Sequence, residues 1–529
     1  MATIAPRRPA WSLPAVAGDA RLLAPVAVGA LVLLSIVLRT RDFDVGFWID
    51  EGLSVGIADR PLSEIPAALR LDGSPPLYYS LLHAWIALFG TSEPATHALS
   101  LVFAVLAVPA AWWAARGLFG PKAALLAALL AATNPFLTQY AQETRMYALV
   151  VLLGILACGA FGRAYVLAGT EAAPERGARR RWAAMFAVTL AALMYTHNWS
   201  LFFAAGCGLT WLVLLFAARG EGRRELLMDG LIGFGGAVLL FSPWLPTLAF
   251  QVQHTGAPWA NAPGLDDLFH IPTLLLGTVA PLALLLAAGA GALALLNRAS
   301  GRFSPRGRAL LVIGGLFLAT VLVAFAASQV SPAWATRYLA VALPPLLLVI
   351  AGGLAHAGRL GLVCALVVAV IWAADGAPTD KSNVRDIAEE IAPSLQPGDL
   401  VVSTQPEQIP VLSYYLPKDL RYATLWGPVD DLGVTDWRDG VERLRGTNAQ
   451  ADLKPLIDAL PRGKRVVLFE PITDDLSRWM APWTQLVRVR STEWGQYVFN
   501  DRRLEPVAVR PLDDSSGVNW LRATVLVKD

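Results

Sequence analysis

Phe47-Trp48-Ile49-Asp50-Glu51 brings two adjacent carboxylates within a dozen residues of the end of the first long apolar segment of the chain. The proline-aromatic stretch Ser74-Pro75-Pro76-Leu77-Tyr78-Tyr79 follows it. A carboxylate pair just outside the hydrocarbon lies where chemistry on a membrane-tethered substrate takes place. We therefore predict an active site at this point of the chain.

Composition indicates a membrane protein independently of that motif. The chain has 529 residues, of which 55% are hydrophobic and 16% are charged, whereas soluble proteins carry about 25% charged residues. Apolar stretches of about 20 residues recur, and each is long enough to cross roughly 30 Å of hydrocarbon as a helix. The net charge of +2 is too small to indicate a nucleic-acid partner.

The apolar stretches predict about eleven transmembrane helices within residues 1–374. They are residues 22–38, 98–115, 122–137, 146–167, 182–196, 199–217, 226–246, 273–296, 309–328, 339–356 and 359–374. The segment Pro75 to Gly90 is short and opens with Pro-Pro, so we expect a helix that lies at the membrane surface. The first span has no small-residue cleavage site after it, which favours an uncleaved anchor over a signal peptide.

Loop charges predict the orientation. With the N-terminus inside, the inner loops hold 18 Lys and Arg, and the outer loops before the C-terminal tail hold 6. This asymmetry follows the positive-inside rule. It places loops 39–97 and 138–145 and the tail outside. We expect a protein of the bacterial inner (plasma) membrane whose active site and C-terminal domain lie on the outer, periplasmic side.

The unusual polar residues gather on the predicted outer face. They are Asp50, Glu51, Asp72, Gln142, Glu143, Arg145, His197, Asn198, His254, Trp259, His270, Arg337 and Tyr338. The spans themselves hold almost no ionisable residue, whereas ion-coupled transporters need some near the midplane. This pattern favours an enzyme that faces the membrane surface over a carrier.

The composition changes at about Asp375, where charged residues and turn formers appear. We predict strands at Leu400 to Thr404, Tyr422 to Leu425, Val466 to Glu470 and Leu486 to Val489, and helices at Asn383 to Leu395 and Leu453 to Leu460. This alternation predicts a C-terminal extracytoplasmic α/β domain over residues 375–529. The chain has no His or Cys cluster with the spacing of a metal site, so we expect no metal and no cofactor.

Four motifs carry a resemblance to a known family. They are Phe47 to Glu51, Asp72 to Tyr79, Leu88 to Glu93 and Gln139 to Tyr147. In this order the chain resembles the membrane glycosyltransferases of the GT-C superfamily, and in particular the branch of protein O-mannosyltransferases and the aminoarabinose transferase that modifies lipid A. The resemblance runs from about residue 20 to 350 and does not cover the tail.

The resemblance implies that a sugar moves from a polyprenyl-phosphate donor to a glycan, lipid or protein acceptor, usually with inversion. An acidic residue in the first outer loop is the general base in such enzymes, and Asp50 matches it, with Glu51 beside it. A second carboxylate in the next outer loop helps to place a substrate, and Glu143 matches that position. Relatives often carry Asp where this chain has Glu143.

The chemistry supports these residue types. A carboxylate that takes the proton of a sugar hydroxyl contributes roughly 10²- to 10⁴-fold to the rate, and Asp50 suits that role. A departing polyprenyl phosphate gains negative charge, which a cation aimed at it stabilises. Arg337, followed by Tyr338, offers a planar fork for phosphate. Arg145 is a second candidate.

Structural roles compete with these assignments. Asp50 and Glu51 also suit the N-terminus of a surface helix over Gly52 to Asp59. Glu143 and Arg145 also suit pairing with other loop charges, and Arg337 also suits an interfacial anchor. We assign the aromatic and imidazole side chains of Tyr78, Tyr79, His197 and Trp259 to substrate binding. Aromatic belts place such residues at the same depth for stability alone.

The sequence thus predicts a polytopic α-helical membrane glycosyltransferase of EC class 2.4, surrounded by membrane lipids. The alternative is a lipid-carrier transporter or flippase, and a third interpretation is a membrane scaffold whose outer domain binds a partner. The scarcity of midplane charges counts against the transporter. The carboxylates of the outer loops count against the scaffold.

Overall fold

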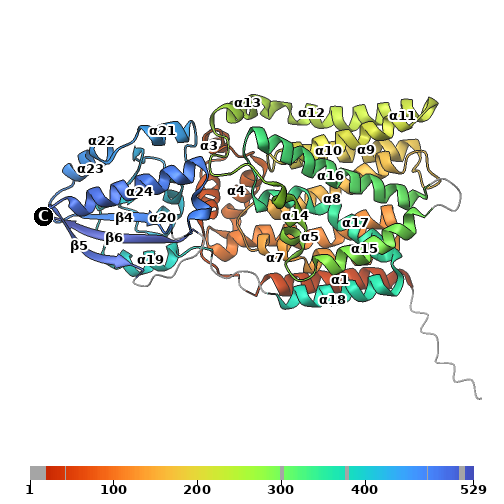
Figure 1. Cartoon of the computed structure of the whole chain (residues 1–529), viewed down its shortest axis with the longest axis horizontal. Helices are drawn as coiled ribbons and strands as arrows, with labels where there is room; N and C mark the ends of the chain where they lie inside the picture. The colour runs from red at the N-terminus through yellow and green to blue at the C-terminus, as the bar shows by residue number, and fades with distance from the viewer. Residues whose placement is uncertain (1–19, 42, 298–302, 376–380, 474, 512–518) are drawn as a thin grey trace, which may run out of the picture.

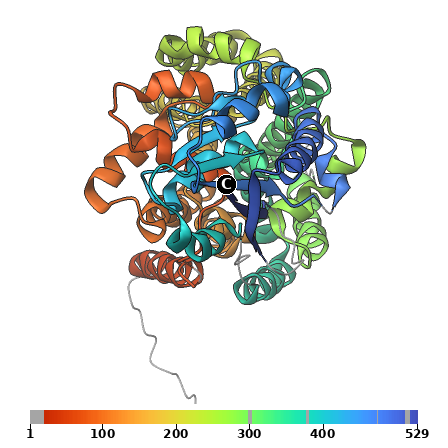
Figure 2. The same cartoon turned by 90° about the vertical axis from the view of Figure 1, so that its left-hand side faces the viewer.

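The computed structural model describes residues 20–41, 43–297, 303–375, 381–473, 475–511 and 519–529. A body of helices and a smaller domain built on a β-sheet lie end to end along the long axis (Figure 1). Figure 2 looks along that axis and shows the sheet in front of the helices, so the smaller domain covers one end of the body. The predicted division into a helical part and a C-terminal α/β part agrees with this arrangement.

Helices occupy every predicted span. They are α1 (Ala20–Arg39), α5 (Glu93–Phe119), α6 (Pro121–Thr133), α8 (Tyr147–Phe161), α9 (Arg176–Met194), α10 (Ser200–Ala217), α11 (Gly220–Gly230), α12 (Gly236–Phe241), α15 (Pro281–Leu296), α16 (Pro305–Val330), α17 (Leu343–His356) and α18 (Gly358–Ala374). Within the described residues, 5 helical stretches are long and apolar enough to cross a membrane, or up to 6 if a bent pair counts as one span. Others are shorter apolar helices, so the number eleven stays a prediction.

The span predicted over residues 273–296 is bent and does not form one continuous helix. The structure divides it between α14 (Leu265–Leu276) and α15, whose axes differ by 92°. Gly277 has a φ of 76°, a left-handed conformation that glycine adopts without steric cost. Pro281 then begins α15 at a position where its missing N–H costs nothing. The apolar run is continuous, but its backbone turns.

Short helices cover the end of the body that faces the sheet domain. They are α2 (Ile49–Ala58), α3 (Ile65–Asp72), α4 (Leu77–Phe89), α7 (Pro135–Tyr140) and α13 (Leu245–His254). The helix expected over Pro75 to Gly90 corresponds to α4. Helix α2 begins three residues before the predicted Gly52, so both Asp50 and Glu51 lie in its first turn.

The sheet has six strands in the order β3-β2-β1-β4-β6-β5. They are β1 (Leu400–Ser403), β2 (Arg421–Thr424), β3 (Gly427–Pro428), β4 (Arg465–Pro471), β5 (Leu504–Arg510) and β6 (Leu521–Lys528). The pairs β1-β2 and β1-β4 are parallel, and the other pairs are antiparallel. The domain's helices include α19 (Val384–Ile391), α20 (Ile409–Tyr415), α21 (Gly440–Gly446), α22 (Ala449–Asp452), α23 (Lys454–Asp458) and α24 (Pro482–Asn500).

Strands β1, β2 and β4 confirm three of the four predicted strands. The fourth, Leu486 to Val489, is wrong because these residues lie inside α24. A short apolar run does not distinguish a strand from a buried helix. The side chains that α24 buries, Trp483, Val487, Trp494 and Val498, recur at helical spacing. Strands β5 and β6 were not predicted.

The two faces of the sheet belong to two different cores. Leu400 and Val402 of β1 pack with Trp483 and Trp494 of α24. Val401, which points to the opposite face because strand side chains alternate, belongs to the core that runs on into the helical body. The sheet domain is therefore fused to the body through a shared apolar core.

Helix α2 fits against the sheet domain through glycine. A Cβ atom on Gly52 would come within 2.6 Å of the Val411 backbone, and one on Gly56 within 2.6 Å of the Gly433 carbonyl oxygen. The backbone also bonds across the boundary, because the Phe47 amide donates to Tyr415 Oη at 2.7 Å and Ser382 Oγ donates to the Phe47 carbonyl at 2.7 Å. The position of α2 thus depends on the sheet domain.

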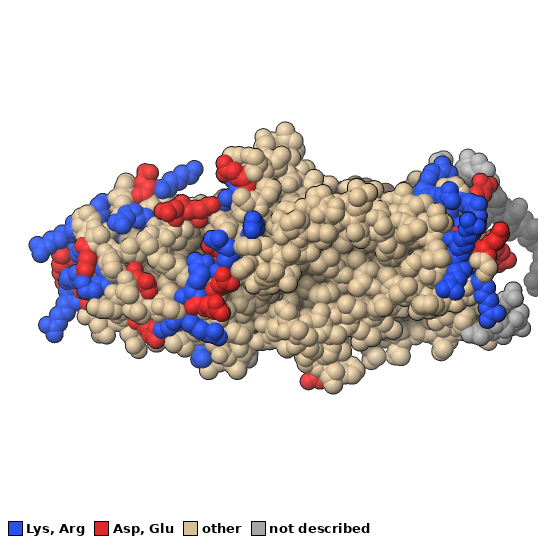
Figure 3. All heavy atoms as spheres, turned by 90° about the horizontal axis from the view of Figure 1, so that it is seen from above, with Lys and Arg blue, Asp and Glu red and all other residues tan. Residues whose placement is uncertain are grey.

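Charge is distributed unevenly along the molecule. On the face shown in Figure 3, Lys and Arg with a few acidic residues gather at the end of the body away from the sheet domain, a broad belt almost free of charged residues follows, and the sheet domain carries both signs. The belt suits a hydrocarbon environment. The basic end and the sheet domain thus lie on opposite sides of the belt, as the loop charges predicted for the two faces of the membrane.

The fit at Gly52 predicts a strong effect of a single methyl group. We expect Gly52→Ala to destabilise the protein by about 1–3 kcal/mol, the usual cost of overpacking. The added methyl group would clash with backbone atoms of Val411, which cannot move aside as a flexible side chain can. The matched control is Gly208→Ala in α10, where a Cβ meets nothing within 4 Å. Unfolding midpoints in detergent test this, and equal midpoints for the two variants would contradict it.

Candidate active site

A cavity of about 1010 Å³ lies at the seam between the helical body and the sheet domain. The body contributes Asp50, Asp72, Arg145, His197, Trp259, Arg337 and Tyr338, and the sheet domain contributes Gln405, Glu407, Trp437, Trp479 and Asn519. The cavity brings together six of the residues that the sequence assigned to the site, namely Asp50, Arg145, His197, Trp259, Arg337 and Tyr338. Its volume is in the upper range of small-molecule sites.

Asp50 lies at the centre of the charged part of this cavity. Its Oδ2 is 3.6 Å from Arg145 Nη2 and 3.5 Å from Arg337 Nε. Neither contact has hydrogen-bond geometry, and Oδ2 has no hydrogen-bond partner among the described residues. The side chain is 17% exposed. Oδ2 itself is buried beside the two guanidinium groups, so the exposure of the side chain comes from its other atoms.

Arg145 and Arg337 flank that carboxylate from two different segments. Arg145 Nη1 is fixed by Ser54 Oγ at 3.0 Å and by the Asp50 carbonyl at 3.2 Å. Arg337, in the 3₁₀ turn Thr336–Val341, lies 5.5 Å from the Trp48 ring and 5.3 Å from the Tyr338 ring. Two guanidinium groups face one carboxylate. Their combined charge and fork geometry suit a phosphate.

His197 and Tyr338 form the wall next to Arg337. Their rings lie 4.8 Å apart, and the Trp199 amide donates to His197 Nδ1 at 3.1 Å. Burial lowers the pKa of His197 to about 3, and the charges of Arg145 and Arg337 act in the same direction. The imidazole is therefore neutral at neutral pH. With Nδ1 accepting, its proton resides on Nε2, which makes Nε2 a donor.

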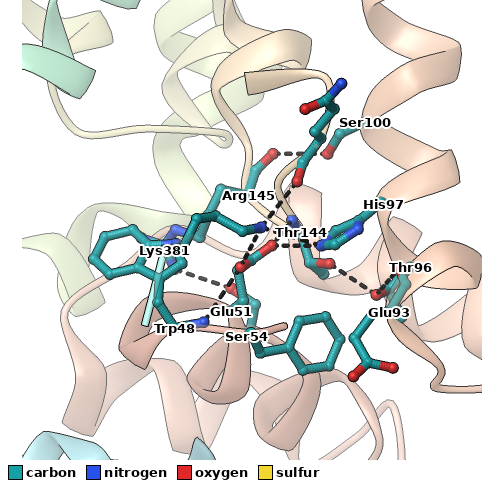
Figure 4. Close-up of polar contacts among 12 residues, drawn as sticks. Trp48, Glu51, Ser54, Glu93, Thr96, His97, Ser100, Thr144, Arg145 and Lys381 are labelled. Carbon is teal, nitrogen blue, oxygen red and sulfur yellow. Dashed lines mark hydrogen bonds and ion pairs between the residues drawn. The ribbon is translucent and has the colours of Figure 1, made fainter. Parts of the chain in front are cut away.

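Glu51 does not line the cavity. Its side chain lies in a cluster of polar contacts with residues from other segments (Figure 4). It is fully buried. Its Oε1 accepts from the Thr144 amide at 2.7 Å and contacts His97 Nε2 at 2.8 Å, and its Oε2 lies 2.7 Å from Lys381 Nζ. The structure places Glu51 in a buried polar network away from the cavity lining, and its predicted catalytic role stays a prediction.

The electrostatics of Glu51 decide its charge state. Burial, the largest effect, acts to raise the pKa of Glu51, but the charges of Lys381 and His97 outweigh it and lower the pKa from 4.5 to about 2. The ionised carboxylate stabilises the fold above pH 4.5 as long as Lys381 keeps its charge. That contribution is lost as the pH falls from 4.5 towards 2.

Glu143 is also buried, and it lies behind the cavity rather than on its lining. Its Oε2 has no hydrogen-bond partner in the described part of the chain. Burial raises the pKa of Glu143 to about 8, and the charges of Glu51 and Asp50 also raise it against the opposing charge of Lys381. At neutral pH this carboxyl group is mostly protonated. The predicted partnership of Glu143 with a substrate stays a prediction.

Tyr78 and Tyr79 lie under the site and do not line the cavity. Both are fully buried; Tyr78 Oη lies 3.2 Å from Ser100 Oγ, and Arg145 Nη1 donates to Tyr79 Oη at 3.4 Å. Tyr79 contacts Arg145 directly, and neither ring forms a wall of the cavity. Trp259 does line the cavity and packs at 4.6 Å against Trp437 of the sheet domain.

Three further charged residues belong to the site, and none was among the residues assigned from sequence. Asp72 and Glu407 line the cavity, and each has one carboxyl oxygen without a partner among the residues described. Burial raises the pKa of Asp72 to about 6 and raises that of Glu407. Lys381 reaches Glu51 from the start of the sheet domain. The sequence did offer a signal for Asp72, because this residue begins the Asp72 to Tyr79 motif. Lys381 and Glu407 carried none.

Within the described ranges, no three His, Cys, Asp or Glu side chains meet in a way that could hold a metal ion. The cavity is lined by two cations, Arg145 and Arg337, and by the four carboxyl groups of Asp50, Asp72, Glu407 and Asp475, and its remaining lining is largely aromatic and aliphatic. This arrangement can bind an anion, accept a proton and enclose an apolar chain.

Comparison with solved structures shows the fold. The chain is similar to ArnT from Cupriavidus metallidurans bound to undecaprenyl phosphate, with a TM-score of 0.59 and 15% identity over 96% of this chain and 98% of that chain. It is also similar to the archaeal oligosaccharyltransferase AglB from Archaeoglobus fulgidus in complex with an inhibitory peptide and a dolichol-phosphate. That likeness has a TM-score of 0.58 and 12% identity over 94% of this chain and 74% of that chain.

No protein-family model matches the chain. No curated protein matches it in sequence. ArnT and AglB are GT-C glycosyltransferases, so the chain has a GT-C fold. This confirms the resemblance that the four motifs indicated. It also extends the likeness over the tail, because the match to ArnT covers 96% of the chain.

The buried ion pair between Glu51 and Lys381 can be tested with a double variant. We expect Lys381→Met to destabilise the protein by roughly 3–5 kcal/mol, because it leaves the Glu51 carboxylate buried without its nearest cation. Adding Glu51→Gln should recover part of that loss. The control is Lys454→Met, whose partner Asp458 is on the surface and whose loss costs about 1 kcal/mol at most. The measurement is the free energy of unfolding in mixed micelles. A double variant no more stable than the single one would contradict the pairing.

Proposed function

We propose that this protein is a membrane glycosyltransferase that moves a sugar from a polyprenyl-phosphate donor to an acceptor, with inversion and with Asp50 as the general base. The observation that carries the proposal is Asp50 itself, a carboxylate on the lining of a cavity of about 1010 Å³ whose Oδ2 lies between two guanidinium groups without a hydrogen bond to either. The acceptor is a glycan, a lipid or a protein.

The donor phosphate takes the place of Asp50 in the contacts of Arg145 and Arg337. In the structure both guanidinium groups lie 3.5–3.6 Å from the Asp50 carboxylate. A phosphate accepts two parallel N–H bonds from each guanidinium and binds more strongly than a contact without hydrogen-bond geometry. Arrival of the donor thus turns the cations to the phosphate and leaves Asp50 free to act as a base.

The reaction then needs one proton transfer and one displacement. Asp50 accepts the proton of the acceptor hydroxyl, whose oxygen forms a bond to the anomeric carbon of the sugar. The bond from that carbon to the phosphate oxygen breaks, and its electrons remain on the polyprenyl phosphate. Arg145 and Arg337 stabilise the negative charge that develops on the leaving oxygen. The Nε2–H of His197 provides a neutral donor beside them.

The lining of the cavity supports a lipid-linked donor. Leu201 and Phe202 of α10 and Val252 of α13 form an apolar side of the cavity near the charged group. This surface suits an isoprenoid chain that reaches the site from the hydrocarbon. The two solved relatives were bound to undecaprenyl phosphate and to a dolichol-phosphate, which are lipid phosphates of this chemical class.

The proposed location is the bacterial inner membrane, with the site on the periplasmic side. The support is the concentration of Lys and Arg at the end of the body opposite the sheet domain (Figure 3), because basic loops stay in the cytoplasm. The test of the whole proposal is incubation of the purified protein with a panel of polyprenyl-phosphate sugars. Consumption of none of them would refute it.

Removal of the base should separate binding from turnover. We expect Asp50→Asn to lower turnover by roughly 10²- to 10⁴-fold, because the amide does not accept the proton. Donor binding should persist or tighten, since a negative charge beside the phosphate is gone. The control is Asp59→Asn at the exposed C-terminal end of the same helix. Turnover within about twofold of wild type at saturating donor would exclude Asp50 as the base.

Removal of the proposed phosphate contact of Arg337 should affect both donor binding and turnover. We expect Arg337→Ala to weaken donor binding and catalysis, because the charge faces the phosphate in the ground state and in the transition state. Arg337→Lys should recover part of the loss, since it keeps the charge but not the fork. The measurement compares affinity for undecaprenyl phosphate with affinity for undecaprenol. The exposed Arg70→Ala variant is the control, and unchanged phosphate affinity in Arg337→Ala would leave Arg145 as the phosphate ligand.

A further inference from the structure

The sheet domain presents a second polar group to the cavity, apart from the two guanidinium groups. Glu407 lies in the 3₁₀ turn Pro406–Gln408 and is buried. Its Oε1 accepts from Trp483 Nε1 at 3.0 Å and from Gln405 Nε2 at 3.1 Å. Its Oε2 is buried as well and has no hydrogen-bond partner in the described residues. One oxygen thus fixes the carboxyl group and the other remains an unused acceptor.

An unused donor lies on the same cavity. Trp259, from the segment after α13, lines the cavity, and its Nε1 is buried with no partner in the part of the chain that the structure describes. Its ring packs at 4.6 Å against Trp437, which in turn packs at 4.9 Å against Trp483. The same stack holds the indole that fixes Glu407. Donor, acceptor and aromatic surface therefore form one connected group.

Backbone hydrogen bonds across the seam hold this group in place. The Trp437 amide donates to the Leu71 carbonyl at 3.0 Å, and the Trp483 amide donates to the Pro258 carbonyl at 3.2 Å. Both bonds join the sheet domain to the helical body on the flanks of the group. Its members come from both domains, so the group exists only in the assembled fold.

The chemistry of the group selects its ligand. A buried acceptor and a buried donor without partners each cost free energy until a ligand pairs with them. A hydroxyl group does both, because it donates to a carboxylate and accepts from an indole N–H. A phosphate would be repelled by the carboxylate, and a purely apolar chain would leave both atoms unpaired. A polyhydroxylated ring with an apolar face satisfies the polar atoms and covers the tryptophans.

We propose that Glu407 and Trp259 form a glycosyl-binding subsite at the domain seam, in which Glu407 Oε2 accepts a hydrogen bond from a sugar hydroxyl and Trp259 Nε1 donates one to a sugar oxygen. The assignment deepens the proposed function and rests on it for the identity of the sugar as a substrate. The sheet domain then has a direct part in substrate recognition, in addition to holding α2.

The first test measures sugar binding without turnover. Saturation-transfer NMR with the full-length protein in detergent and a panel of methyl glycosides of hexoses and pentoses should show binding of at least one glycoside. Glu407→Gln keeps the shape and the Oε1 acceptor but replaces Oε2 by a donor. It should weaken that binding about tenfold or more, the factor that a hydrogen bond to a charged group contributes, and Trp259→Phe should weaken it as well.

The matched control is Glu470→Gln. Glu470 lies in β4 of the same sheet and is partly buried, but it does not line the cavity. Its variant should bind glycosides as the wild type does, and all three variants should bind undecaprenyl phosphate normally. Absence of glycoside binding to the wild type would overturn the subsite. Unchanged glycoside binding in Glu407→Gln, or equal loss of undecaprenyl phosphate binding, would also overturn it.

A second measurement distinguishes the two sources of the sugar. If the subsite holds the donor sugar, Glu407→Gln lowers affinity for an undecaprenyl-phosphate sugar but not for undecaprenyl phosphate. If it holds an acceptor sugar, the variant raises the acceptor KM and leaves donor affinity unchanged. Glycoside binding that depends on Glu407 in a protein that consumes no polyprenyl-phosphate sugar would refute the proposed function and keep the subsite. If the protein consumes a polyprenyl-phosphate sugar and Glu407→Gln binds donor, acceptor and glycosides as the wild type does, the proposed function stands and the subsite is refuted.

Discussion

The ion pair between Glu51 and Lys381 is the interaction on which the geometry of the site depends. A carboxylate that is removed from water must be paired and hydrogen-bonded, or it destabilises the fold by several kcal/mol. Glu51 meets that requirement with Lys381 Nζ at 2.7 Å, His97 Nε2 at 2.8 Å and the Thr144 amide at 2.7 Å. These partners come from the start of the sheet domain, from α5 and from the loop before α8. One side chain thus ties three separate segments to helix α2.

Asp50, the residue before Glu51 on α2, lines the cavity, whereas Glu51 is buried away from it. Successive side chains on a helix point about 100° apart, because a turn contains 3.6 residues. With Glu51 directed into the protein, Asp50 is directed towards the cavity, where it meets Arg145 and Arg337. The anchor fixes the rotation of α2 and therefore the position of the carboxylate that faces the cavity. Of the two carboxylates in the motif, Glu51 is buried among polar partners and Asp50 lines the cavity.

The sheet domain determines the site from three directions. It supplies Lys381 to the anchor, it presses on α2 at Gly52 through the Val411 backbone, and it lines the cavity with Glu407. Because one face of the sheet shares a core with the helical body, the two parts hold one cavity between them. A structure of the helical body alone would lack the seam, the anchor and the aromatic group around Trp259. The site belongs to the whole chain.

The sequence by itself determined the features that depend on short stretches of chain. The length and polarity of each apolar run predicted the helices, and the change of composition at Asp375 marked the second domain. The motifs around Asp50 and Arg145 predicted the GT-C fold, which the comparison with ArnT confirms. The tertiary structure decided which of these residues meet. Lys381 lies 330 residues after Glu51, and Glu407 lies 357 residues after Asp50. No local pattern encodes such pairings, because they arise only when the sheet packs on the helical body and burial forces each charge to find a partner.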